Sequence, residues 1–220
     1  MSRVKWMGWW DGKILVGAIL LLVLEGCLGG GPAPQDHYYR LELQPPVTSL
    51  DVPPLKGTLQ ILRPWADALT GERHIVYRQD SGTAQLHRHA YHRWVDSPTN
   101  LLQQEIAKYL RASNIAEQVV IPEHRTNSDY VLSCRMAKLE RVLGGSPRVV
   151  IELELGLTHT REREAFWLHT YTEEQQANGA GVPEAVMAFN QALAHILDRF
   201  VVDVSERENE ERDETNVGTE

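Results

Sequence analysis

Two alternating segments in the second half of the chain constrain the fold most strongly. From residue 148 to residue 158 every second residue is a branched apolar one, and Glu152 and Glu154 occupy intervening positions. This two-residue period is typical of a β-strand with one buried face, and the carboxylates belong to the other face. Residues 130–139 alternate in a similar way, and the Gly-Gly-Ser-Pro sequence at 144–147 is typical of a turn. We therefore predict two neighbouring strands joined by a turn.

The rest of the chain adds shorter strands and two amphipathic helices. Further strand patterns are found at residues 37–43, 59–62, 74–79, 85–95, 117–121 and 165–172. The turn-forming sequence Asp-Ser-Gly-Thr at residues 80–83 predicts that the strands at 74–79 and 85–95 form a hairpin. Ser97 and Pro98 suit the N-cap and first turn of a helix that we expect to end near Asn114. Apolar residues at helical spacing predict a second helix from Pro183 to about Val202. The predicted fold class is α+β, with a mostly antiparallel sheet and both helices packed on one of its faces.

An apolar run near the N-terminus carries a second strong signal. Residues 14–24 are uncharged and follow a basic segment at residues 3–13. The run is too short for a membrane-spanning helix, which needs about 20 residues, but it suits the hydrophobic part of a secretory signal. It ends in Leu-Glu-Gly-Cys at residues 24–27, which looks like the cleavage site of a bacterial lipoprotein. The resemblance implies that residues 1–26 are a signal peptide and that acyl chains such as palmitate are attached to Cys27.

Two other interpretations of this run stay open. It would be an uncleaved anchor if Glu25 and the short length were tolerated, or an ordinary signal peptide followed by an incidental cysteine. In the lipoprotein interpretation, the residue after the cysteine is Leu28 rather than the Asp that commonly retains lipoproteins at the inner membrane. The resemblance therefore implies the inner leaflet of an outer membrane, with the protein facing the periplasm.

Composition divides the remaining chain into three parts. Residues 27–36 are rich in Gly and Pro and should form a flexible tether behind the acylated cysteine. Residues 37–204 contain the predicted strands and helices. Residues 205–220 contain seven acidic residues and two arginines with almost no apolar side chains, so we expect a disordered tail. Removal of the signal changes the net charge from −8 to −9, which argues against nucleic acid as a partner.

The sequence contains no strong catalytic constellation. It lacks G-x-S-x-G, P-loop, H-E-x-x-H and paired C-x-x-C motifs, so we predict that the chain is not an enzyme and has no cofactor. His87, His89 and His92 resemble a metal-binding group, but on a regular strand His92 lies on the opposite face, so no metal site is predicted. Acylation of Cys27 would leave Cys134 without a disulfide partner, and its place in a strand pattern predicts a buried apolar role.

Trp65 is the main candidate for an interface residue. It follows Arg63 in a loop-like segment, and exposed aromatic residues on loops often anchor interfaces. We expect a homo-oligomer in which the loop Arg63–Thr70 lies near an interface.

Several short motifs follow one another along the chain in an informative order. In sequence these are Cys27 after the signal, Tyr38-Tyr39-x-Leu41, Leu59-Gln60-Ile61, Tyr91-His92-Arg93-Trp94, Ser97-Pro98 with Leu101 and Leu102, Asp129-Tyr130-Val131-Leu132, and a terminal amphipathic helix. Together they resemble the ABC-type transport auxiliary lipoproteins of the PqiC type. The resemblance implies a fold like the N-terminal domain of TolB and an accessory role in an MCE-type lipid-transport system that spans the envelope. It implies no catalytic residues.

The expected function is therefore positional. A lipid-anchored, periplasm-facing domain would dock the transporter to the outer membrane. The alternative is a lipoprotein that acts as a scaffold or activator of cell-wall or outer-membrane assembly machinery.

Overall fold

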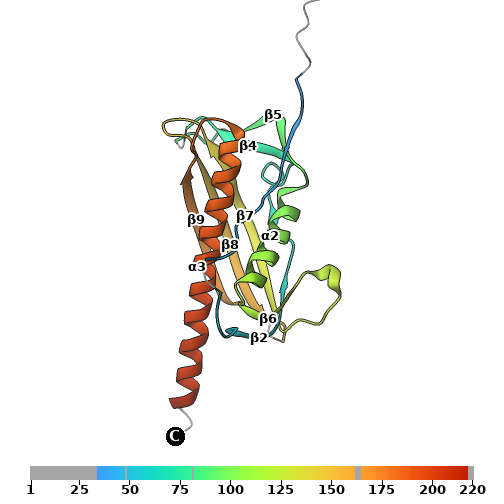
Figure 1. The fold of residues 1–220 in the computed structure, drawn as a ribbon, viewed down its shortest axis with the longest axis vertical. Helices are drawn as coiled ribbons and strands as arrows, with labels where there is room; N and C mark the ends of the chain where they lie inside the picture. The colour runs from blue at the N-terminus through green and yellow to red at the C-terminus, as the bar shows by residue number, and fades with distance from the viewer. Residues whose placement is uncertain (1–33, 48, 81, 162–164, 218–220) are drawn as a thin grey trace, which may run out of the picture. The chain divides into compact units, whose positions relative to one another are not determined.

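Three long antiparallel strands form the largest part of the sheet in the computed structural model (Figure 1). The structure describes residues 34–217 except 48, 81 and 162–164. These strands are β7 (Tyr130–Val142), β8 (Arg148–His159) and β9 (Ala165–Gln176). The predicted alternation of β8 is confirmed: the side chains at 149, 151, 153, 155 and 157 are buried. The predicted signal peptide 1–26 and Cys27 lie outside the described residues.

Short strands complete a nine-stranded mixed sheet on the other side of β7. They are β1 (His37–Tyr39), β2 (Leu55–Ile61), β3 (Trp65–Ala66), β4 (His74–Arg78), β5 (His87–Trp94) and β6 (Ala116–Val120). Strands β2, β3 and β4 pair one after another with successive parts of β7, each in parallel orientation. Strand β6 joins β2, and β5 joins β4 in the predicted hairpin. The α+β class is confirmed, and the antiparallel pairs contain the longest strands, whereas the short strands pair mainly in parallel.

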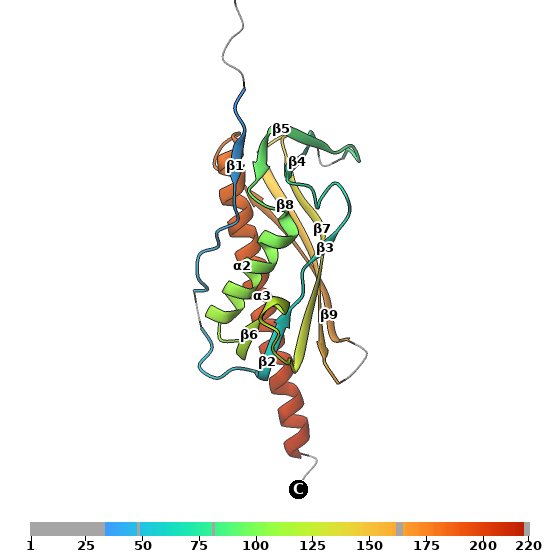
Figure 2. The same ribbon diagram turned by 90° about the vertical axis from the view of Figure 1, so that its right-hand side faces the viewer.

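Two helices cover one face of this sheet, as predicted (Figure 2). They are α2 (Pro98–Ala112) and α3 (Val182–Val217). The Ser97 side chain accepts a hydrogen bond from the backbone N–H of Asn100, which caps the first turn of α2. Apolar residues of both helices, including Ile106 and Phe189, are fully buried against the concave face of the sheet.

The predicted disordered tail, residues 205–220, is wrong for most of its length. Helix α3 continues through this region to Val217 instead of ending near Val202. The sequence between these points contains no Gly or Pro and is rich in Glu and Arg, which are good helix formers, so a helix already held by packing extends without a breaker. Low apolar content therefore did not prevent helix formation here.

The predicted first strand, residues 37–43, is also shorter than expected. Only His37–Tyr39 is a strand. Residues 40–47 and 49–54, which we call the strap, have no regular secondary structure and contact both helices. Leu41 and Leu43 of the strap are buried in the core, with 3% and 5% exposure. Their alternation reflects packing onto helices rather than pairing in a sheet.

Candidate interaction surfaces

The first strand is held by a cluster of aromatic rings. The Tyr39 hydroxyl is 2.9 Å from Nδ1 of His92, and the rings of His37 and His92 stack with centroids 5.0 Å apart. The backbone of β1 pairs in parallel with β5, and the N–H of Val95 donates to the Tyr39 carbonyl at 2.7 Å. Asp36 lies 3.8 Å from Arg93. The segment that immediately follows the predicted tether is thus fixed to the sheet by both backbone and side chains.

The histidines of β5 do not follow the regular strand that the sequence suggested. The register of β5 shifts against β4, because Arg88 pairs with Val76 whereas Arg93 pairs with His74. The bulge brings the rings of His89 and His92 to a centroid distance of 5.4 Å, so the predicted placement of His92 on the opposite face was wrong. Within the described part of the chain, no group of three or more His, Cys, Asp or Glu residues is arranged to hold a metal ion.

Arg141 is a buried cation behind this cluster that sequence reasoning missed. It is 3% exposed, its Nη1 lies 3.0 Å from Nε2 of His89, and its Nη2 donates to the Ala180 carbonyl at 2.6 Å. Burial, with the nearby guanidinium as a smaller cause, lowers the pKa of His89 to about 4. Burial likewise lowers the pKa of His92, followed by the effects of His37 and Arg141. The cluster therefore favours neutral imidazoles.

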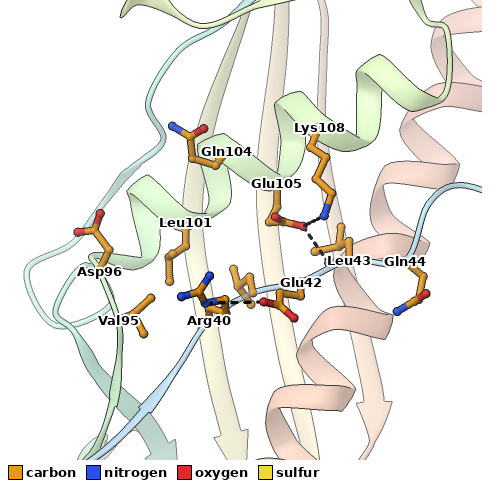
Figure 3. A pocket seen from close by; sticks show the side chains of 11 residues that line it. Arg40, Glu42, Leu43, Gln44, Val95, Asp96, Leu101, Gln104, Glu105 and Lys108 are labelled. Atoms are coloured by element: carbon orange, nitrogen blue, oxygen red, sulfur yellow. Dashed lines mark hydrogen bonds and ion pairs between the residues drawn. The ribbon is translucent and has the colours of Figure 1, made fainter.

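The strap forms one wall of a polar groove of about 640 Å³ (Figure 3). Helix α2 forms the opposite wall, where Glu105 accepts a hydrogen bond from the backbone N–H of Leu43 at 2.8 Å and lies 3.5 Å from Lys108. On the strap side, Arg40 and Glu42 are 3.7 Å apart. The cationic side chains of the groove thus already have carboxylate partners, and the contacts serve to hold the strap.

A second hollow, of about 340 Å³, lies where the strap reaches α3. Its lining includes Val47, which is 96% exposed, and Met187, which is 54% exposed. The Tyr109 hydroxyl closes one side by donating to Asp198 at 2.6 Å, and this bond links the two helices. Burial, with Asp198 as the next cause, raises the pKa of Tyr109. The strap, α2 and α3 thus form one surface with an apolar centre.

The two predicted interface residues, Trp65 and Arg63, are both exposed, but they contact different partners. Trp65 belongs to the short strand β3, which the sequence did not predict, and is 60% exposed. The Arg135 guanidinium lies over its ring, 5.0 Å from the centroid. Arg63 instead lies 3.8 Å from Glu123. The structure leaves both side chains available for contacts, and their interface role stays a prediction.

Other candidate residues take structural positions. Cys134 is 3% exposed with a free thiol, as predicted, and burial raises the pKa of that thiol. Glu152 lies close to Lys138 at 2.5 Å across the β7–β8 pair. No helix in the described part of the chain has the length and apolar character needed to cross a membrane.

The fold and these surfaces define the class of protein: an α+β domain with a clamped first strand, a strap across two helices and exposed aromatic residues. The chain belongs to the family described as the ABC-type transport auxiliary lipoprotein component, whose family model matches residues 39–201. This match confirms the family resemblance seen in the sequence. A comparison with curated proteins found no match.

Solved structures share the fold. A Xanthomonas campestris protein of the DUF330 family, which is the PqiC-type family, has a TM-score of 0.68 and 18% identity, and the match covers 79% of this chain and 99% of that one. A second crystal structure has a TM-score of 0.60 and 15% identity, and the match covers 78% of this chain and 100% of the other. At these identities the likeness extends to the fold alone.

Proposed function

We propose that this transport auxiliary lipoprotein is anchored to the inner leaflet of the outer membrane and docks an envelope-spanning, MCE-type lipid transporter there. The observation that carries the proposal is the family match over residues 39–201, combined with the lipoprotein-type sequence that ends at Cys27. The clamped strand β1 supports it, because it gives a tether a fixed point of attachment on the domain. The mechanism is positional and needs no chemical step.

The anchor limits where the domain can act. Each buried methylene of an acyl chain contributes about 0.8 kcal/mol, so several chains on Cys27 hold a domain durably. Residues 28–36 span at most roughly 30 Å when fully extended, so the domain stays close to the membrane surface. The first residues of the folded domain would therefore stay within this distance of the outer membrane.

The lipid anchor is tested by replacing Cys27 with Ser. The variant should no longer incorporate a labelled fatty acid and should move to the soluble periplasmic fraction. Leu28→Asp is the matched control, because it retains the thiol and should keep the label while shifting the protein toward the inner membrane in a host with enteric-type sorting. Unchanged labelling of the Cys27→Ser protein would rule out the anchor.

The partner is tested by isolating the acylated protein from solubilised membranes and identifying co-purified proteins by mass spectrometry. MCE-domain or ABC-permease subunits are expected. Recovery of cell-wall or outer-membrane assembly proteins in their place would favour the alternative function of a scaffold or activator.

Self-association is the second part of the proposal. Many tethered copies on one membrane raise the effective concentration of weak contacts, and homo-oligomers usually have closed symmetry. The exposure of Trp65 supports a contact near the loop Arg63–Thr70. Light scattering of the purified protein should give more than the protomer mass, and Trp65→Ala should weaken the association. A monomer mass that Trp65→Ala does not change would contradict this part.

A further inference from the structure

Among the strands that the structure describes, four have a neighbour on one side only, and they differ in how their free edge is treated. Strand β3 has only two residues. Strand β1 has three residues. Strand β6 has five, and its Val119 carbonyl accepts hydrogen bonds from Nε and Nη2 of Arg111, at 3.3 and 2.8 Å. Strand β9 has twelve residues and pairs with β8 alone. A long open edge is the kind that natural proteins usually protect.

The backbone groups that β9 presents at its free edge can be assigned from the ladder. The N–H of Ala177 donates to the Pro147 carbonyl, and these two residues lie in the same register as Arg148 and Gln176. Hydrogen-bonded and non-hydrogen-bonded pairs alternate in an antiparallel ladder. The odd-numbered residues of β9 therefore direct their backbone N–H and C=O groups toward β8. The even-numbered residues therefore direct their N–H and C=O groups outward.

These outward groups are largely open. Among the described residues, the Thr172 carbonyl accepts a hydrogen bond from Nη2 of Arg199 at 3.1 Å, and the Gln176 carbonyl accepts one from Nε2 of Gln175 at 3.4 Å. The backbones of Leu168, Thr170 and Glu174 have no such bond within the described part of the chain. The side chains are exposed too, and Leu168 is 66% exposed.

Over most of its length, the strand also lacks the prolines, lysines and bulges that discourage pairing. Residues 165–176 include no Pro, Gly or Lys, and the register with β8 is constant from Arg148 to Leu157. Five of its twelve residues are Thr, Tyr, Phe or Trp, which favour strands. Its edge is therefore long, regular from Trp167 to Gln176, and covered by Arg199 only at Thr172.

We propose that the β9 edge is a self-association site, at which β9 of one copy pairs antiparallel with β9 of a second copy. The inference rests on the self-association in the proposed function and names a second surface for it, apart from the loop Arg63–Thr70. The sequence of the strand favours one register, in which Thr170 lies opposite Thr172 of the second copy. This register places His169 opposite Glu173 twice and keeps the carboxylates of the two copies apart. A register in which Glu173 of one copy lies opposite Glu173 of the second would bring like charges together, which is unfavourable.

Helix α3 supplies further contact area beside the same edge. His195 and Arg199 contact Glu173 of β9, at 3.2 and 3.1 Å, and this places their side of the helix next to the strand. Val202 follows Arg199 by three residues on that side and is 52% exposed. A two-fold axis through the paired strands would bring the two α3 helices near each other, where these valines lose exposure. The surface is thus self-complementary in both backbone and side chains.

Disulfide cross-linking of the full chain in detergent tests both the edge and the register. The double variant Thr170→Cys/Thr172→Cys should form covalent dimers on mild oxidation, because opposed residues have Cα atoms about 5.5 Å apart, within disulfide range. Each single variant is a matched control. In a dimer of a single variant, the introduced cysteines of the two copies are offset by two residues and should cross-link about tenfold less. The native Cys134 is buried and does not compete.

A proline scan separates the edge from the fold. Thr170→Pro removes an outward N–H and no bond to β8, so it should abolish the dimer while the thermal melting curve is retained. If Thr170→Pro fails to fold, Leu168→Lys at the same edge replaces it. A folded edge variant that self-associates like the wild type would overturn the proposal, as would absence of the cross-link in the double variant. Loss of the transporter partner with the cross-link intact would instead count against the docking function alone.

Discussion

Phe189 tests the core that joins the helices to the sheet. Its side chain is 0% exposed, and its ring meets the Trp94 ring edge-on with centroids 5.8 Å apart. Replacing Phe189 with Ala removes the whole ring from a closely packed site that has little room to collapse. We expect a loss of about 3–5 kcal/mol in the free energy of unfolding, the usual range for a buried aromatic residue.

The measurement is urea unfolding of the purified protein, followed by circular dichroism and by tryptophan fluorescence. Met187→Ala is the matched control, because this residue lies in the same helix but is 54% exposed, and should change stability by under about 1 kcal/mol. The melting temperature of Phe189→Ala should fall by roughly 10 °C, since a chain of this size loses about 2–4 °C per kcal/mol. Equal losses in the two variants would refute the assignment of Phe189 to the central core.

Three further perturbations address other regions. His89 has a pKa of about 4 against its ordinary 6.5, so its neutral form stabilises the fold fully above pH 6.5. The free energy of unfolding should therefore fall as the pH drops from 6.5 toward 4. His89→Gln should flatten this pH dependence in chemical unfolding. Glu140 pairs with Arg78 and is 3% exposed, so Glu140→Ala should cost about 3–5 kcal/mol, and a much smaller loss in thermal unfolding would show that water reaches the arginine. Truncation after Ser205 should reduce the helical signal at 222 nm without lowering the melting temperature by several degrees, because residues 206–210 are at least partly exposed.

The parts of the fold that the sequence predicted correctly are those with a strong local period. The alternation of β8 and the apolar stripes of α2 and α3 each repeat over many residues, so tertiary contacts reinforced the local signal. The hairpin of β4 and β5 was found from its turn residues. The packing of both helices on one face of the sheet was predicted from the order of the strands and helices.

The features that the sequence did not predict depend on contacts between distant residues. The strap is fixed by side chains far along the chain: the N–H of Glu42 donates to Asn190 at 3.0 Å, and Asn114 donates to the Leu50 carbonyl at 2.8 Å. The short strand β3 exists only because β7 is long enough to pair with three strands in succession. The bulge of β5, which gathers the histidines, has no signature in a single sequence.

The candidate surfaces divide in the same way. The exposure of Trp65 was predictable from its unusual setting, whereas its contact with Arg135 required knowledge of the register between β3 and β7. Arg141 lies beyond the strand that was predicted over residues 130–139, so no sequence pattern indicated that it is buried beside His89.

The clamp on β1 also sets how the domain responds to mechanical load. A pull on the chain ahead of Asp36 acts first on a strand of three residues, whose parallel pairing with β5 is short. Failure there would transfer the load to Leu41 and Leu43, which must leave the core before the central strands feel any force. Such a sequence of small breaks dissipates work near the point of attachment, because each step opens only a local unit. The long strands β7, β8 and β9 are thus the last part of the sheet to be strained.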